Sequence, residues 1–95
     1  MSTDTTIHRT IAVGSRVGLH ARPAAAVVKA AQELPAVVKI AKGESTPADC
    51  RSLLSILALG AEQGDEVTLS AEGDGAEESV AALAALIESD QDEGA

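Results

Sequence analysis

The sequence of 95 residues contains no phenylalanine, tyrosine or tryptophan and only one cysteine. Without aromatic rings the protein has no platform on which nucleic-acid bases can stack, so nucleic acid is not an expected partner. A single cysteine forms no disulfide within the chain, which is typical of a reducing compartment. No apolar run approaches the roughly 20 residues of a membrane-spanning helix. Because the sequence has no aromatic residue, its hydrophobic core must be aliphatic.

The beginning of the chain lacks the pattern of a signal peptide. Residues 1–6 contain neither the basic nor the apolar part of a secretory leader. We therefore expect a cytoplasmic protein with no direct membrane insertion. The length predicts one domain over residues 1–88, which is long enough to bury a core. The acidic stretch at 89–95 is expected to be a disordered tail.

The net charge of −8 is unevenly distributed along the chain. All seven basic residues lie within residues 1–51, where four acidic residues oppose them, and the remaining stretch holds eleven acidic residues and no basic one. The acidic part is typical of a solvated surface. The basic residues are either ordinary solvated charges, or together they create a local positive field that attracts a phosphate or an acidic protein. General binding of nucleic acid is not expected.

Hydrophobic spacing predicts an alternation of short strands and helices, in the order β-α-β-β-α-β-α. Pro23 is tolerated only in the first turn of a helix, which places that helix start next to His20. The pair Leu34-Pro35 ends the same helix. The expected strands cover residues 7–13, 36–42, 45–49 and 65–71, and the expected helices cover 21–33, 52–59 and 76–88.

This order predicts an α+β open-faced sandwich, in which a four-stranded, largely antiparallel sheet has three helices on one face. The adjacent strands at 36–42 and 45–49 can pair as a hairpin, and Pro47 indicates an edge position or a bulge. Arg9 interrupts the apolar face of the first strand, which suggests an edge or a frayed start. The expected buried positions of the helices are Ala24, Val27, Val28, Ala31, Val80, Leu83, Ala84 and Ile87.

The most informative stretch is Gly18-Leu19-His20-Ala21-Arg22-Pro23-Ala24-Ala25, which puts a histidine at a helix start and an arginine two positions on. A helix start has unpaired backbone N–H groups and the positive end of the macrodipole, so it attracts anions such as phosphate. The arginine fork suits phosphate oxygens. A histidine at this place can attack a phosphoryl group, with Arg22 as the stabilising cation and Ala21, Arg22 and Pro23 as the helix-start phosphate site. Taken without further context, a histidine at a helix start is more often a cap or a surface residue.

The same stretch resembles the active-site signature of the HPr family, the histidine-containing phosphocarriers of the bacterial phosphoenolpyruvate:sugar phosphotransferase system. The resemblance runs from about residue 7 to residue 88 and includes Arg51-Ser52-Leu53-Leu54 and residues 67–73. It implies that phosphorylated Enzyme I passes a phosphoryl group, derived from phosphoenolpyruvate, to Nδ1 of His20. His20 would then pass the group to the IIA domains of sugar permeases.

Two further features lie in the predicted second helix. Ser52 is a plausible N-cap, with Gly60 as the residue that ends the helix. By resemblance Ser52 also matches the serine that HPr kinase/phosphorylase modifies in some bacteria, although Ser55 stands where a glycine is common. The leucines of so short a helix cannot all face one core. They predict a docking patch for partners at Leu53, Leu54 and Leu57, with tight packing between two layers as the alternative.

Several other interpretations stay open. A carrier of the nitrogen-regulatory branch shares the His–Arg–Pro arrangement, and a non-catalytic binding module of the same fold would serve a transcriptional regulator. An independent enzyme is not expected, because the sequence shows no metal-ligand set and no glycine-rich nucleotide loop; no cofactor or metal is expected either. The chain is expected to be a monomer.

Four residues are assigned ordinary roles. His8 is expected on the surface, and Arg16 and Lys29 are solvated charges unless the fold brings them to His20. Cys50 is expected to have a small, partly buried structural role, although a nearby helix start could lower its pKa.

Overall fold

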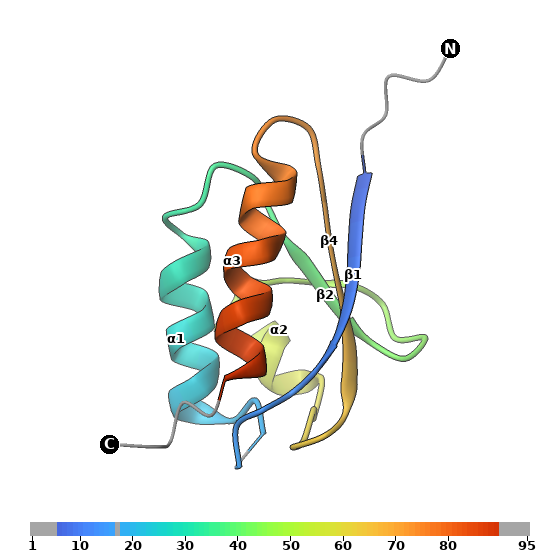
Figure 1. Cartoon of the computed structure of the whole chain (residues 1–95). Helices are drawn as coiled ribbons and strands as arrows, with labels where there is room; N and C mark the ends of the chain where they lie inside the picture. Colours follow the sequence, from blue (N-terminus) through green and yellow to red (C-terminus); the bar gives the residue numbers. More distant parts are fainter. Residues whose placement is uncertain (1–5, 17, 90–95) are drawn as a thin grey trace.

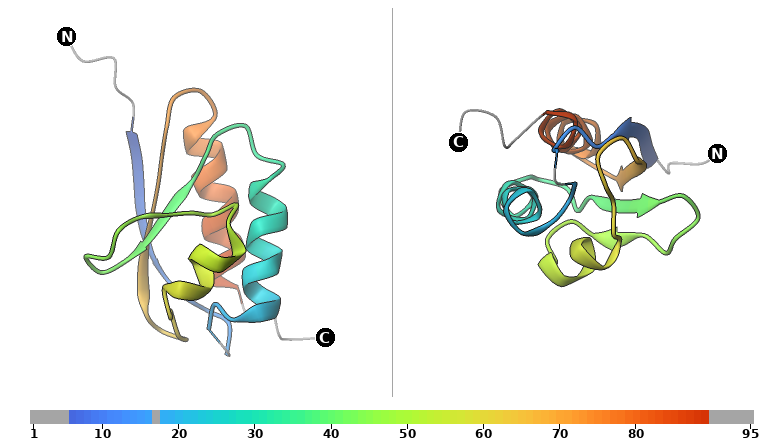
Figure 2. Two further views of the ribbon diagram at one scale, coloured as in Figure 1. Left: turned by 180° about the vertical axis from the view of Figure 1, so that it is seen from behind. Right: turned by 90° about the horizontal axis from the view of Figure 1, so that it is seen from below.

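The computed structural model describes residues 6–16 and 18–89, which form seven elements in the predicted order (Figure 1). Four antiparallel strands form one sheet in the order β1-β4-β2-β3. The three helices cover one face of this sheet (Figure 2). The predicted open-faced sandwich is therefore confirmed. The elements are β1 (Thr6–Ala12), α1 (Ala21–Ala31), β2 (Lys39–Lys42), β3 (Ala48–Asp49), α2 (Leu53–Ala58), β4 (Glu66–Glu72) and α3 (Ala76–Glu88).

The predicted tail at 89–95 lies outside the described residues except for Ser89. Among the described residues, no helix is long and apolar enough to cross a membrane.

The first helix ends two residues earlier than predicted. The N–H groups of Glu33 and Leu34 donate to the carbonyls three residues before them, those of Ala30 and Ala31, at 3.0 and 3.2 Å. Such bonds tighten the end of a helix. They follow from Pro35, because a proline disfavours the α-helical conformation in the residue before it.

The two middle strands are shorter than predicted, with β2 at 39–42 and β3 at 48–49 instead of 36–42 and 45–49. Ala36 is bound to α3 rather than to the sheet, because its N–H donates to Ser79 Oγ at 3.2 Å. Ser45 is part of the turn, since its N–H donates to the carbonyl of Lys42 at 3.1 Å. Pro47 has no N–H to donate, so the ladder of β3 begins only after it.

The predicted edge positions are correct. β1 is one edge of the sheet and β3 is the other. The open face of the sheet carries polar side chains: Thr10 Oγ1 of β1 lies 2.9 Å from Thr68 Oγ1 of β4, and His8 lies across from Ser70. The opposite face of β4 is buried under the helices.

The core is aliphatic, as expected, and lies between the sheet and the helices. Of the predicted helix positions only Val28 is not fully buried; it is half-buried and packs against the core. The side chains below 2 % exposure that fill most of this space are Leu19, Ile40, Ile56, Leu69, Leu83, Ile87, Val13, Val27, Val38, Val67, Val80 and Pro23. Leu19 is the residue directly before His20, so the core reaches to the beginning of α1.

Candidate functional site

His20 is the N-cap residue of α1. Its backbone is extended, with φ −99° and ψ −161°, and its carbonyl accepts the N–H of Ala24 at 2.8 Å. Its side chain is exposed and makes no capping hydrogen bond. The imidazole is therefore presented to solvent and is not used to stabilise the helix.

The first turn of α1 forms the surroundings of this imidazole. The first helical bond starts at Ala24, so the N–H groups of Ala21 and Arg22 precede the hydrogen-bonded part of the helix. No acidic residue of this turn offsets the positive end of the helix. The Arg22 side chain is exposed. Pro23 is buried and has no N–H, so its contribution to the predicted phosphate site is to pack the helix start, while Ala21 and Arg22 supply the donors.

The loop before α1 is held against a distant part of the chain. The N–H of Leu19 donates to the carbonyl of Ala61 at 2.9 Å. Gly18 has φ +72°, and a Cβ built there would lie 2.5 Å from the Ala61 oxygen and 2.8 Å from Glu62 Cα. The tight contact requires glycine at this place. No periodicity of the sequence connects residues 18 and 61, so these contacts were not predicted.

Three of the basic residues are placed by their element or by an ion pair. Lys29 lies in the last turn of α1, about 12 Å along the axis from the first residue of the helix at 1.5 Å per residue. Lys42 Nζ lies 3.1 Å from Asp65 Oδ2, and Arg51 Nη2 lies 3.0 Å from Asp49 Oδ2. Two cations are thus paired with acidic residues outside α1, and Arg22 is the basic residue of the first turn of α1.

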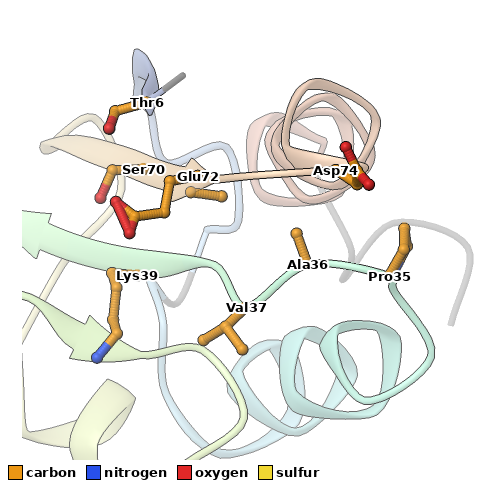
Figure 3. Close-up of a pocket in the computed structure, with 9 residues that line it drawn as sticks. Thr6, Pro35, Ala36, Val37, Lys39, Ser70, Glu72 and Asp74 are labelled. Atoms are coloured by element: carbon orange, nitrogen blue, oxygen red, sulfur yellow. The ribbon is translucent and has the colours of Figure 1, made fainter. Parts of the chain in front are cut away.

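A hollow of about 500 Å³ lies near the other end of α1 (Figure 3). Its lining includes Pro35, Val37, Lys39 and Glu72, and it contains neither the histidine nor the arginine of the site. Among residues 6–16 and 18–89, no three His, Cys, Asp or Glu side chains form a group that could hold a metal ion.

Comparison with known proteins shows which protein family this chain belongs to. The family described as "PTS HPr component phosphorylation site" matches residues 7–89. The chain belongs to the HPr family. Members of the HPr family are phosphocarriers rather than independent enzymes. This chain is therefore a phosphocarrier of the HPr and NPr type.

Individual proteins that are similar to this chain are also phosphocarriers of the HPr and NPr type. Phosphocarrier protein HPr of Streptomyces coelicolor is 42% identical over 79 residues, which are 83% of this chain and 85% of the relative. Phosphocarrier protein NPr of Escherichia coli K12 is 33% identical over 88 residues, or 93% and 98% of the two chains. The crystal structure of HPr from Bacillus anthracis superposes with a TM-score of 0.81 at 33% identity, covering 86% of this chain and 96% of that one.

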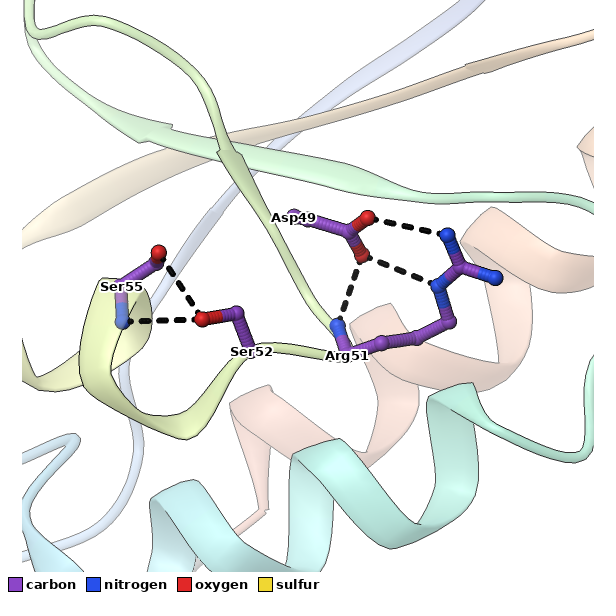
Figure 4. Close-up of polar contacts among 4 residues, drawn as sticks. All are labelled: Asp49, Arg51, Ser52 and Ser55. Atoms are coloured by element: carbon purple, nitrogen blue, oxygen red, sulfur yellow. Dashed lines mark hydrogen bonds and ion pairs between the residues drawn. The ribbon is translucent and has the colours of Figure 1, made fainter.

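Ser52 is the N-cap of α2, as predicted (Figure 4). Its Oγ accepts the N–H of Ser55 at 3.3 Å and donates to Ser55 Oγ at 3.0 Å. Directly before it, the Asp49 carboxylate accepts the backbone N–H of Arg51 at 2.8 Å and its guanidinium at 3.0 and 3.2 Å. The guanidinium bonds lower the pKa of Asp49. Phosphorylation of Ser52 by HPr kinase/phosphorylase stays a prediction from the HPr family resemblance.

The leucines of α2 divide between core and surface. Leu54 is 80% exposed and Leu53 39% exposed, while Ile56 is completely buried. Leu57 is half-buried and packs against the core. Figure 2 shows α2 beside the first half of α1, the half that begins at the predicted HPr phosphorylation site. The helix that carries the exposed leucines therefore packs beside the half of α1 that His20 begins.

The burial of Cys50 and the pKa of its thiol differ from what was predicted. It is completely buried, and burial, together with the charge of Asp49, raises the pKa of its thiol to about 12. The suggestion that a nearby helix start lowers this pKa is wrong, because desolvation of the thiolate outweighs the helix dipole. Cys50 is a core residue, buried more completely than the partial burial that was predicted. His8 is exposed on β1, as predicted.

Proposed function

We propose that this protein accepts a phosphoryl group from phosphorylated Enzyme I on Nδ1 of His20 and passes it to the IIA domains of sugar permeases. The observation that supports this most directly is the exposed imidazole at the start of α1, which makes no capping bond and has Arg22 two residues away. A histidine with a purely structural role at this position would be expected to bond to the helix it begins.

The proposed chemistry needs little beyond this geometry. The lone pair of Nδ1 forms a bond to phosphorus while the bond between phosphorus and the donor breaks. The product gains negative charge beside the N–H groups of Ala21 and Arg22, which stabilise it with the positive end of α1. The guanidinium of Arg22 adds a charge-assisted contact. Because the site is exposed, the next protein can approach phosphorus and remove the group.

The proposal is tested by incubating the protein with phosphoenolpyruvate and the Enzyme I of the same organism. One phosphoryl group per chain should appear by mass spectrometry, stable in base and lost in acid, as expected for a phosphohistidine. A chain that stays unmodified while a control HPr protein is labelled by its own Enzyme I would contradict the proposal.

The nitrogen-regulatory branch is the alternative, since both HPr and NPr proteins are among the relatives. The phosphorylated chain should be mixed separately with IIA proteins of the two branches. Faster transfer to a sugar IIA supports the proposed branch, and faster transfer to a nitrogen IIA supports the alternative. A pure binding module of a transcriptional regulator is less well supported, because binding alone requires neither a nucleophile nor the adjacent Arg22.

Replacing Arg22 by alanine should slow phosphoryl transfer to the protein by about 10- to 100-fold, since one charge-assisted contact contributes about 1.5–3 kcal/mol. Its exposed side chain should leave the unfolding midpoint nearly unchanged. The matched control is Arg9→Ala, which removes the same charge from the exposed edge of β1. Equal transfer rates in the two variants would exclude Arg22 from the mechanism.

We also propose that Leu53, Leu54 and Leu57 form the docking patch for Enzyme I. Leu54→Ser should raise the KM of Enzyme I for this protein by about 10-fold, because an interfacial leucine that loses its burial costs on the order of 1.5 kcal/mol. At saturating concentration kcat should change little, since the imidazole is untouched. Val37→Ser alters an exposed apolar residue near the other end of α1 and should leave KM as it is. An unchanged KM in Leu54→Ser would contradict the docking patch.

A further inference from the structure

The loop that carries His20 rests on segment 60–65, which joins α2 to β4. Besides the bond from Leu19 to Ala61, the Gln63 side-chain amide donates to the carbonyl of Gly14 at 3.4 Å. Two more bonds, each 2.9 Å long, join Val13 to this segment: Val13 N–H donates to the Asp65 carbonyl, and Gly64 N–H donates to the Val13 carbonyl. The position of the loop therefore depends on the position of the segment.

One lysine side chain contacts segment 60–65 at both of its ends. Lys42 Nζ, at the end of β2, lies 3.1 Å from Asp65 Oδ2 and donates to the carbonyl of Gly60 at 3.2 Å. The same carboxylate oxygen accepts the N–H of Glu62 at 2.9 Å. These bonds lower the pKa of Asp65, the Glu62 N–H first and Lys42 second. One ammonium group thus connects the two ends of the segment.

We propose that Lys42 and Asp65 are positioning residues for the phosphoryl-acceptor site. The ammonium holds segment 60–65 in one conformation, the Ala61 carbonyl then holds Leu19, and Leu19 directly precedes His20. Neither charged side chain is proposed to touch the phosphoryl group. The role rests on the function proposed for His20, but the contacts that define it do not.

The first test measures the bond between Leu19 and Ala61. Lys42→Met keeps the length of the side chain and removes the ammonium. Because exposed ion pairs contribute modestly, amide hydrogen exchange at Leu19 should become about 2- to 5-fold faster. Asp65→Asn keeps an acceptor for the Glu62 N–H but loses the charge, so it should behave like Lys42→Met, and Lys42→Arg should restore slow exchange. Lys39→Met, an exposed lysine of the same strand, is the charge-matched control.

The second test measures the consequence at the imidazole. In Lys42→Met the ring proton signals of His20 should shift in NMR spectra, while those of His8 serve as the internal reference. Phosphorylation by Enzyme I should lose kcat by about 2- to 5-fold with KM unchanged, because the docking patch on α2 is not altered. A general loss of stability would change exchange throughout the protein and would not separate kcat from KM.

The inference is overturned if Leu19 exchange and the His20 signals are the same in Lys42→Met as in Lys39→Met. If the wild-type protein takes up no phosphoryl group at all, the proposed function fails. The exchange at Leu19 then decides by itself whether Lys42 and Asp65 hold the loop.

Discussion

Replacing His20 with alanine should reduce phosphoryl uptake from phosphoenolpyruvate and Enzyme I to background, while the protein stays folded. The imidazole is exposed and makes no capping bond, so its removal should cost about 0.5 kcal/mol or less of the free energy of unfolding. The expected loss of labelling is complete, because no other atom at the start of α1 can form the bond to phosphorus. Uptake is measured by mass spectrometry under the conditions given above.

The chain provides a matched control for this experiment. Its only other histidine, His8, is also exposed, but it lies on β1 and faces the open side of the sheet. His8→Ala should be labelled as fast as the wild-type protein. Labelling of His20→Ala at the wild-type rate, or its loss in His8→Ala alone, would falsify the assignment of the acceptor.

The second large effect is expected for Gly18→Ala. At φ +72° any residue with a Cβ is strained by about 1–2 kcal/mol. The new Cβ would also lie 2.5 Å from the Ala61 oxygen and 2.8 Å from Glu62 Cα. Both are backbone atoms that cannot rotate away, and such overpacking costs about 1–3 kcal/mol more. We expect the free energy of unfolding to fall by about 2–5 kcal/mol, measured by denaturant titration.

The variant Gly43→Ala separates the cost of the left-handed backbone from the cost of the Cβ overlap. Gly43 has φ +60°, but a Cβ there has no atom within 4 Å. This variant should therefore lose only the cost of the left-handed backbone, about 1–2 kcal/mol. Equal losses in the two variants would contradict the tight contact between Gly18 and segment 60–65. In the folded fraction of Gly18→Ala, phosphorylation should also be slower, because the displaced loop carries the acceptor.

Much of the fold could be predicted because the deciding interactions are local. Ser52 caps α2, Gly60 ends it and the buried face of α3 follows the helical period, all within a few residues along the chain. The start of α1 belongs to the same class, because Pro23 places it next to His20 from adjacent residues alone. The acceptor role of His20 was instead predicted from the resemblance to the HPr family.

The parts that were missed depend on residues far apart in the sequence. The order of the sheet places β4 between β1 and β2, and Ala36 leaves the second strand because it bonds to Ser79 of α3. The ion pair between Lys42 and Asp65 likewise could not be predicted from a sequence pattern, since neither residue lies in a motif. The burial of Cys50 decides its pKa, and burial is a property of the whole fold.

The contacts of Gly14 have a consequence for the order of synthesis. Its N–H donates to the carbonyl of Ile87, almost at the end of α3, at 3.0 Å, and a Cβ at this glycine would overlap the carbonyl of Glu88. The loop before His20 is made early by the ribosome, whereas one of its supports, the end of α3, is made last. A chain arrested before α3 would lack this support, so we expect finished copies of the protein to accept the phosphoryl group from Enzyme I faster than such fragments.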